Sequence, residues 1–383
     1  MAKNKKFSVA LTLFLAIACL AAGCAVGFLG GGIVSAKQFK SDEAPRVKSN
    51  EAPRVLVEGE LQIHFLELGN KYTGDCTYIK AGETDILIDA GSKTSSIPTI
   101  SEYLNQYVTD GKLEYVIVTH AHEDHYAGFS KRDGSIFDLF EIGTVIDFAR
   151  TNQKEKNDSG KTTMYGDYQA ELSEAVGRGT THYKANECIE DKENKNNFDL
   201  GNGITLEILD SYFYYNDAGT ENDYSVCSLF TYGDYQYLFT GDLEEKGEKK
   251  LVEMNELSPV NLYKGGHHGS KTSSSDALLS VIKPEIVCVC CCAGSPEYTK
   301  TDANQFPTQE FVDRIAPYTD RVYVTSRCID YKAGTFASMN GNITVVTDKN
   351  GLKVICSADD RVLKEWEWFK EHRQCPAAWK PAA

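Results

Sequence analysis

The sequence predicts a mixed α/β protein, because short strand-like runs alternate with helical stretches along most of its length. Glycine-containing turns at 82–84 and 233–234 join two pairs of these runs into expected hairpins. The 383 residues, 42% apolar and 25% charged, are enough for a large core in one or two domains. The expected strands cover residues 61–68, 77–80, 85–88, 115–119, 203–209, 226–232, 235–240 and 287–292, and the expected helices cover 97–107, 168–176 and 243–254.

The first 36 residues have the pattern of a membrane segment. Lys3, Lys5 and Lys6 precede an uncharged stretch over residues 7–36. That stretch exceeds the apolar part of a cleavable signal, about 7–15 residues, and is long enough for a span of about 20. The basic flank predicts that the rest of the chain lies outside the cytoplasmic membrane. We therefore expect an N-terminal signal anchor over 1–36, with a lipoprotein modified at Cys24 as the alternative.

The rest of the chain divides into three further parts. Residues 37–58 contain a charged, proline-bearing segment that occurs twice, and they are expected to form an extended tether. A folded domain is expected over 59–357, followed by a C-terminal tail over 358–383. Of the twelve cysteines, four crowd the run 287–292, where neighbours point to opposite faces of a strand. We expect buried small hydrophobes there, and no disulfide framework.

A candidate metal site follows the apolar run 115–119. Three of the eight histidines and an aspartate fall within six residues, at His120, His122, Asp124 and His125. Imidazole nitrogen suits zinc, copper, iron and nickel, and a carboxylate adds an oxygen ligand. His120 and His122 are expected to bind one ion, and Asp124 and His125 a neighbouring ion.

Four residues elsewhere in the chain, one before and three after this segment, are candidates for the same site. Asp89 ends a strand and either orients a ligating histidine or forms a turn. Asp242 ends a hairpin and either bridges two ions or caps the helix that follows. His267 follows two glycines and is expected to be the last metal ligand, with His268 beside it facing substrate.

Two other histidines are not expected to be ligands. His64 lies on the polar side of its strand, which predicts an exposed side chain. His182 lies among polar residues and is expected to be solvated.

These motifs occur in the order that is typical of one enzyme family. The chain resembles the metallo-β-lactamase superfamily of hydrolases, and within it the hydrolase domain of the ComEC-like competence DNA-uptake proteins. The resemblance covers roughly residues 60 to 357. The segments that carry it are 61–69, 74–75, 86–91, 120–125, 221–226, 238–242 and 266–270.

The resemblance implies a four-layer αββα sandwich that binds two divalent metal ions, with zinc favoured and manganese the alternative. His120 and His122 would bind the first ion, Asp124, His125 and His267 the second, and Asp242 would bridge them. A metal-bound hydroxide would attack the substrate, with Asp124 and His268 as catalytic residues.

Two departures from the superfamily pattern bear on this assignment. The first ion lacks a histidine where this chain has Glu221-Asn222-Asp223, so one of these side chains or water must complete its shell. A glycine-histidine-proline turn that is usual in the competence proteins is replaced by Gln305-Phe306-Pro307.

The implied substrate is a phosphodiester, such as DNA or another nucleic acid. However, the net charge of −15 and the lack of a basic stripe are unfavourable for binding a long polyanion. A small or cell-wall phosphodiester is therefore the alternative substrate. A metal-binding sensor module without turnover is the alternative function, supported by the incomplete first site.

Overall fold

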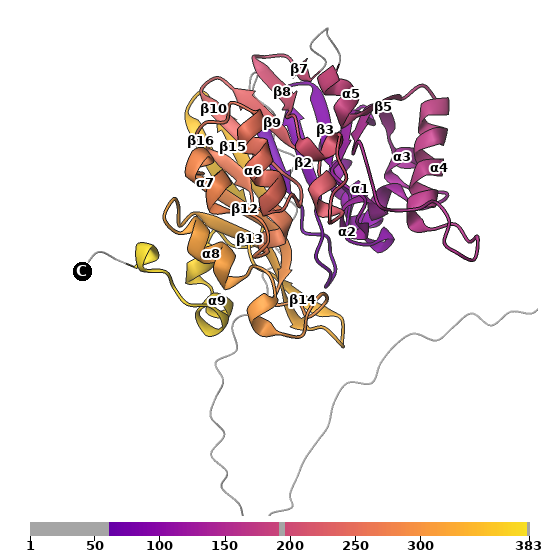
Figure 1. Ribbon diagram of the computed structural model, residues 1–383. Helices are drawn as coiled ribbons and strands as arrows, with labels where there is room; N and C mark the ends of the chain where they lie inside the picture. Colours follow the sequence, from indigo (N-terminus) through magenta and orange to yellow (C-terminus); the bar gives the residue numbers. More distant parts are fainter. Residues whose placement is uncertain (1–60, 191–195, 381–383) are drawn as a thin grey trace, which may run out of the picture. The chain divides into compact units, whose positions relative to one another are not determined.

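The computed structural model describes residues 61–190 and 196–380. It confirms a mixed α/β fold with two eight-stranded sheets (Figure 1). In spatial order the first sheet consists of β16 (Gly351–Cys356), β15 (Ile343–Asp348), β1 (Leu61–Phe65), β2 (Thr77–Ala81), β3 (Thr84–Ile88), β4 (Lys112–Val118), β5 (Glu141–Asp147) and β6 (Thr181–Lys184). The second consists of β14 (Thr335–Ser338), β13 (Val322–Asp330), β12 (Ile286–Ala293), β11 (Leu262–Lys264), β10 (Tyr235–Phe239), β9 (Ser228–Tyr232), β8 (Ile204–Ile208) and β7 (Asn197–Asp199).

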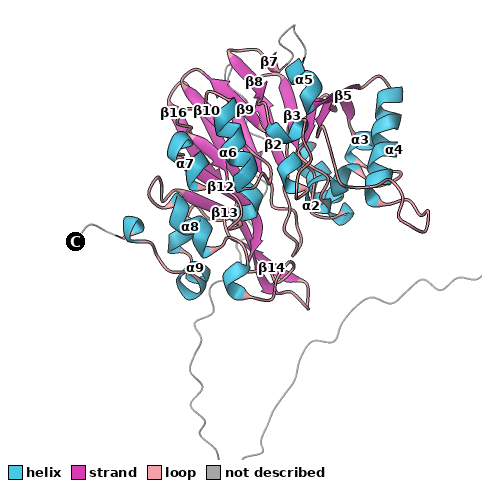
Figure 2. Cartoon of the chain, viewed as in Figure 1, coloured by secondary structure: helices cyan, strands magenta, loops and turns pink. Residues whose placement is uncertain are grey.

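Helices cover the outer faces of the two sheets, so the layers run helix, sheet, sheet, helix (Figure 2). Apolar side chains of both sheets share one buried cluster between them, and a second cluster lies under the helices of the second sheet. On the side of the first sheet lie α1 (Ile97–Leu104), α3 (Ile136–Leu139) and α4 (Met164–Gly177), with the short α2 (Glu123–Tyr126) and α5 (Ala185–Glu190) nearby. On the side of the second sheet lie α6 (Glu245–Met254), α7 (Asp276–Ile282), α8 (Gln309–Ile315) and α9 (Glu367–His372).

The prediction that His64 is exposed is wrong. Strand β1 lies inside the first sheet, paired with β15 and β2, and all of its residues are buried. Helix α1 covers the face that the alternation assigned to solvent, and Tyr103 of α1 places its hydroxyl 2.8 Å from Nδ1 of His64. Burial lowers the pKa of His64 to about 3, so the ring is a neutral part of the core.

The C-terminal residues pack on the second sheet. Trp366, Trp368 and Trp379 are buried in the cluster that also contains residues of α6, α7 and α8. The tail that the sequence predicts is therefore in contact with the sandwich.

The predicted anchor (1–36) and tether (37–58) lie outside the described residues. Within 61–190 and 196–380, no helix is both long and apolar enough to cross a membrane. No disulfide joins the cysteines of this part of the chain.

Candidate metal centre

The candidate residues lie just after the carboxyl ends of parallel strands. Strand β3 is parallel to β4 in the first sheet, and β10, β11 and β12 are parallel in the second. Because parallel strands end at the same edge of a sheet, residues distant in sequence meet there. Asp89 follows β3, the segment 120–125 follows β4, Asp242 follows β10, and the pair at 267–268 follows β11.

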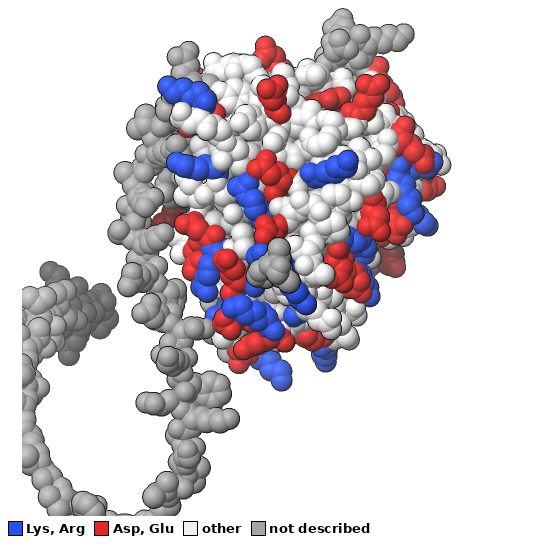
Figure 3. Space-filling view, turned by 90° about the vertical axis from the view of Figure 1, so that its left-hand side faces the viewer, with Lys and Arg blue, Asp and Glu red and all other residues white. Residues whose placement is uncertain are grey.

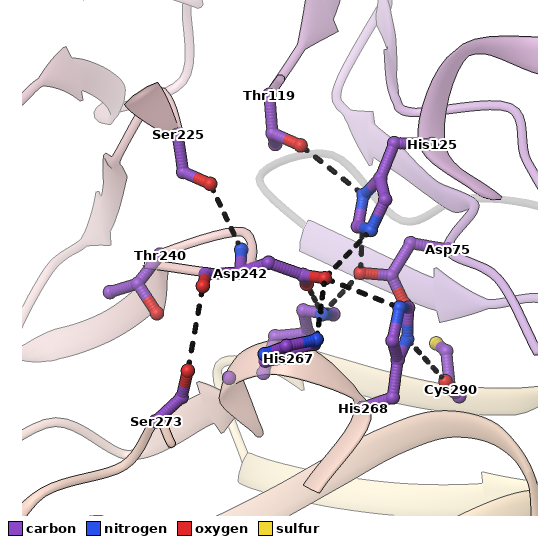
Figure 4. Close-up of polar contacts among 12 residues, drawn as sticks. Asp75, Thr119, His125, Ser225, Thr240, Asp242, His267, His268, Ser273 and Cys290 are labelled. Atoms are coloured by element: carbon purple, nitrogen blue, oxygen red, sulfur yellow. Dashed lines mark hydrogen bonds and ion pairs between the residues drawn. The ribbon is translucent and has the colours of Figure 1, made fainter. Parts of the chain in front are cut away.

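The carboxylate of Asp242 is the centre of the site (Figure 4). The residue is only 1% exposed, and its backbone N–H donates to Oγ of Ser225 at 3.0 Å. Its Oδ2 atom lies within 4.0 Å of ring nitrogens from four histidines, at 3.1 Å from His125 Nε2, 3.4 Å from His268 Nε2, 3.7 Å from His267 Nε2 and 4.0 Å from His120 Nε2. Helix α6 begins at Glu245 with Glu244 as its N-cap, so Asp242 does not cap it.

One side of Asp242 is formed by His125, His268 and Asp124. His268 Nε2 lies 3.2 Å from Asp124 Oδ2, and its Nδ1 lies 3.0 Å from the carbonyl oxygen of Cys290. The rings of His125 and His268 are 5.1 Å apart. The expected catalytic residue His268 is thus buried among the expected ligands.

His120 and His267 approach Asp242 Oδ2 at the two longer distances, and His122 lies beside His120. His120 Nε2 lies 3.0 Å from His122 Nδ1, and the binding of one ion by both residues stays a prediction. His267 is the more open of the paired histidines, with 20% of its side chain exposed, against 1% for His268.

Asp89 contacts His125, as one of its two interpretations expects, and its carboxylate makes no hydrogen bond to the backbone that directly follows it. It accepts hydrogen bonds from the backbone N–H and hydroxyl of Thr119, both at 2.8 Å, and its Oδ2 lies 2.7 Å from Nδ1 of His125. Its backbone has φ 59°, the left-handed conformation that aspartate tolerates in turns. Because Asp89 binds Nδ1, Nε2 of His125 is left to face Asp242.

Two charged residues of the site were not among the candidates. Asp75 comes from the loop between β1 and β2, and its Oδ1 lies 3.2 Å from His268 Nδ1. The ammonium group of Lys264, at the end of β11, forms an ion pair with Asp75 and lies 4.0 Å from Asp242 Oδ1. The turn 74–75 belonged to the family resemblance, but a single aspartate or lysine beside a strand is too common to indicate a site.

The side chains fit a metal site. One ligand atom each from Asp75, His125, Asp242 and His268 lies within 4.8 Å of all the others, and these residues are buried. Asp242 Oδ1 is buried without a hydrogen-bond partner, and the buried nitrogens His125 Nε2 and His268 Nε2 contact only carboxylate oxygens. Buried polar atoms of this kind are costly unless something binds them, and a divalent cation would do so.

Burial and neighbouring charges shift the pKa values of the site's histidines and of Asp242 in opposite directions. Burial alone would lower the pKa values of His125 and His268, but the carboxylates around them outweigh it and raise both. At His120, and at His267, burial dominates and the pKa falls. Burial would raise the pKa of Asp242, but His125 and the paired histidines hold it well below its usual range. Metal binding would replace the protons held by His125 and His268.

The remaining candidates lie away from this centre. His182 Nε2, in β6, lies 2.9 Å from Oδ1 of Asp147 at the end of β5, so His182 is paired and partly buried, although we expected it to be solvated. Glu221 accepts hydrogen bonds from the hydroxyl of Thr151 and the backbone of Asn152, both at 2.7 Å, and thus turns away from the histidines.

Comparison with known proteins supports the family expectation over part of the chain. Residues 69–131, which include Asp75, Asp89 and His120 to His125, match the model of the metallo-beta-lactamase superfamily. Recombination protein 2 of Haemophilus influenzae is 29% identical over 32% of this chain and 14% of its own length. ComE operon protein 3 of Bacillus subtilis is 26% identical over 35% of this chain and 18% of its own length. The chain therefore spans less than a fifth of either relative.

Among solved structures, the metallo-beta-lactamase fold protein YhfI from Bacillus subtilis aligns with 72% of this chain and 98% of its own, at 10% identity and a TM-score of 0.38. The match to the superfamily model and the similarity to these two relatives confirm the expected resemblance. Over residues 69–131, this chain matches the metallo-beta-lactamase superfamily.

Proposed function

We propose that the protein is a metal-dependent hydrolase that cleaves phosphodiesters. One observation carries the proposal: a buried carboxylate, Asp242, has four imidazoles within 4.0 Å of one oxygen, and Asp75 and Asp124 lie on the same side as His268. A pair of divalent ions held there, zinc or manganese, would supply Lewis acidity and lower the pKa of a water molecule to near neutrality.

The chain's own residues account for the positioning that such a reaction needs. Asp89 fixes the tautomer and orientation of His125, and Lys264 neutralises part of the negative charge of Asp75. The hydroxyl of Tyr298 donates to Asp124 Oδ2 at 2.6 Å, and Tyr298 itself is 54% exposed. This phenol therefore marks where the buried site opens to solvent.

The phosphodiester part of the proposal is supported by the competence relatives and by the donors near the opening. Ser270 and Lys271 follow the paired histidines after Gly269, and Lys271 is exposed, with its ammonium group 2.9 Å from Asn304 Oδ1. On the side where α7, α8 and α9 lie, Lys and Arg are interspersed with Asp and Glu (Figure 3). With a net charge of −15, this favours substrates bound through one or a few phosphates over long duplexes held along a basic stripe.

The test is an assay of the purified full chain, loaded in turn with manganese, zinc and magnesium. Bis(p-nitrophenyl) phosphate, a short single-stranded DNA and a glycerophosphodiester are the substrates, and Asp242→Ala is the matched inactive variant. We expect metal-dependent turnover of at least one phosphodiester by the wild type and its loss in the variant. If the metal-loaded wild type cleaves none of them, the proposal fails, and a metal-binding sensor takes its place.

We further propose that residues 1–36 anchor the protein in the cytoplasmic membrane with the folded domain outside. The thirty uncharged residues at 7–36 behind Lys3, Lys5 and Lys6 support this. The protein should fractionate with membranes, and protease added from outside should digest it. A soluble, shortened form in the medium would contradict the anchor, and palmitate on Cys24 would show the lipoprotein instead.

A further inference from the structure

The 266–275 loop joins β11 to α7 and carries both of the paired histidines. Three of its residues with a β-carbon have left-handed backbone conformations: His267 at φ 46°, His268 at φ 54° and Ser274 at φ 56°. Such residues adopt this region at an energetic cost and persist there when the surrounding structure holds them. The positions of the two imidazoles therefore depend on the groups that fasten this loop.

A buried carboxylate on helix α6 fastens the far end of the loop. Glu248 is fully buried, and its Oε1 and Oε2 accept the backbone N–H groups of Ser274 and Ser275 at 2.6 Å and 2.7 Å. Burying a carboxylate is costly unless donors satisfy it, and hydrogen bonds from backbone N–H groups to an ionised oxygen are among the stronger ones. Each oxygen of Glu248 thus holds one residue of the loop.

Capping of helix α7 is the ordinary explanation for a carboxylate at this place. Helix α7 begins at Asp276, with Ser275 as its N-cap. A capping group binds N–H groups inside the first turn of a helix. The two N–H groups bound by Glu248 instead belong to the N-cap and to the residue before it. The carboxylate therefore holds the loop rather than the first turn of the helix.

An arginine on a different helix holds the same loop by its carbonyl groups. Nη2 of Arg314, on α8, donates to the carbonyl oxygens of Lys271 and Ser273, at 2.8 Å and 2.7 Å. A positive group on carbonyl oxygens and a negative group on N–H groups bind opposite ends of the peptide dipoles. Arg314 and Glu248 therefore fasten neighbouring parts of the loop from two helices.

Further hydrogen bonds connect this fastened segment to the metal centre. Oγ of Ser274 lies 3.1 Å from the hydroxyl oxygen of Tyr263, which accepts the N–H of Gly266 at 3.1 Å. Oγ of Ser273 donates to the carbonyl oxygen of Asp242 at 3.4 Å (Figure 4). Because Gly266 directly precedes the first histidine, a shift at the far end of the loop would reach both the histidines and the backbone of the central aspartate.

We propose that Glu248 and Arg314 are positioning residues of the metal centre. By fixing the end of the loop they preserve its left-handed backbone, so that Nε2 of His267 and of His268 stay 3.7 Å and 3.4 Å from Asp242 Oδ2. The groups of a binding site must be held to within about 0.5 Å of their working positions. This role rests on the metal site of the proposed function, although neither residue is itself a ligand.

The experiment compares metal affinity with global stability in the full chain. Affinity for cobalt(II), used in place of zinc, is measured by competition with a chelator. The pH is 8, where Glu248 is ionised because burial raises its pKa only to about 7. The visible absorption of bound cobalt(II) reports the ligand geometry independently of activity.

Two variants release the loop from opposite sides. Glu248→Gln keeps the volume of the side chain but replaces one accepting oxygen by an NH2 group, which cannot accept a backbone N–H. Arg314→Gln removes the guanidinium that binds the carbonyl groups.

Two matched controls on α6 separate positioning from stability. Leu251→Ala removes a fully buried apolar side chain, so it lowers the unfolding midpoint without removing a hydrogen bond of the loop. Glu253→Gln removes an exposed carboxylate whose partner is Lys250.

We expect cobalt(II) binding to be about 10–100-fold weaker in Glu248→Gln and in Arg314→Gln, as for other groups that orient metal ligands, with a changed absorption spectrum. Leu251→Ala should unfold earlier but bind cobalt(II) with the affinity and spectrum of the wild type. Glu253→Gln should match the wild type in every measurement.

Three results would overturn the positioning role: no cobalt(II) binding by the wild type, wild-type affinity and spectrum in Glu248→Gln, or an equal loss of affinity in Leu251→Ala. If Glu248→Gln does not fold, Arg314→Gln, at a partly exposed position, decides in the same way. The proposed function fails on a different result. A wild type that binds cobalt(II), loses affinity in both variants and cleaves no phosphodiester would keep the positioning role and remove the hydrolase.

Discussion

Asp89 and His125 form the closest carboxylate–imidazole contact of the metal centre, with Oδ2 of Asp89 2.7 Å from Nδ1 of His125. The opposite ring nitrogen of His125 lies 3.1 Å from Asp242. A chain of three groups therefore runs from the end of β3 through the segment after β4 to the end of β10, and it links the two sheets through one imidazole.

Replacement of Asp89 by asparagine should weaken metal binding without removing a ligand. The amide keeps the volume but loses the charge that fixes the Nδ1–H tautomer of His125, and such substitutions cost about 10–100-fold in metal affinity. Metal affinity of Asp89→Asn, measured by competition with a chelator, checks this. Asp276→Asn, at an exposed position that begins α7, should bind metal as the wild type does. Unchanged affinity in Asp89→Asn would contradict the orienting role.

Replacement of Asp242 by alanine should lower the affinity for both ions. Its Oδ2 is near histidines on each side, so the deletion removes a ligand from two sites at once. Dialysis at graded metal concentrations should show both binding steps shifted to higher concentration, whereas His125→Ala shifts one. Asp234→Ala, in the exposed turn between β9 and β10, is the control. The loss of a single ion from Asp242→Ala would rule out the bridging role.

Replacement of Gly91 by alanine should disrupt the centre from a position that bears no ligand. A β-carbon at Gly91 would lie 1.6 Å from the backbone oxygen of Asp124, which is impossible without movement of the segment that carries His122 and His125. We expect a loss of unfolding free energy of at least about 1–3 kcal/mol, together with weaker metal binding. Gly219→Ala, with no atom within 4 Å of the added carbon, should leave both unchanged in denaturant titrations and dialysis.

The buried Glu248 predicts a specific pH dependence of stability. Burial raises its pKa to about 7 from 4.5, although the backbone N–H groups of Ser274 and Ser275 donate to it at 2.6 Å and 2.7 Å. The folded state therefore holds a proton that the unfolded state releases. This contribution is fully present below pH 4.5 and is lost as the pH rises to about 7.

The unfolding free energy of the wild type relative to Glu248→Gln should therefore fall between pH 4.5 and 7, by up to about 3 kcal/mol, and then stay constant. Glu253→Gln, exposed on the same helix, should follow the wild type at every pH. A constant difference between the wild type and Glu248→Gln would show that Glu248 is ionised in the folded protein across this range.

The sequence predicted the structure best where the local pattern of apolar and polar residues matches their burial in the folded protein. The run 115–119 and the histidines after it predicted a buried strand and a polar cluster at its end, and the structure places both there. The alternation of apolar and polar residues in β1 was misleading. It indicates which residues share a face of the strand, but it does not show whether a helix covers the polar face. His64 is buried for that reason under Tyr103 of α1.

The composition of the centre depends on contacts that no local pattern contains. Asp75 and Lys264 meet only because the β1–β2 loop and the end of β11 converge from opposite sheets. The different directions of His267 and His268 depend on a left-handed backbone that two adjacent histidines do not indicate. The roles of these residues as metal ligands stay predictions for the binding experiments.

The origin of the ligands on both sheets has a consequence for how the protein matures. Asp75, Asp89 and the segment 120–125 belong to the first sheet, whereas Asp242 and the pair at 267–268 belong to the second and are made more than a hundred residues later. During synthesis, the early half emerges without the carboxylate that joins the imidazoles. Binding of the proposed ions would therefore be complete only late in folding, after the two sheets have docked, so a chain with both ions bound would also be a correctly folded chain.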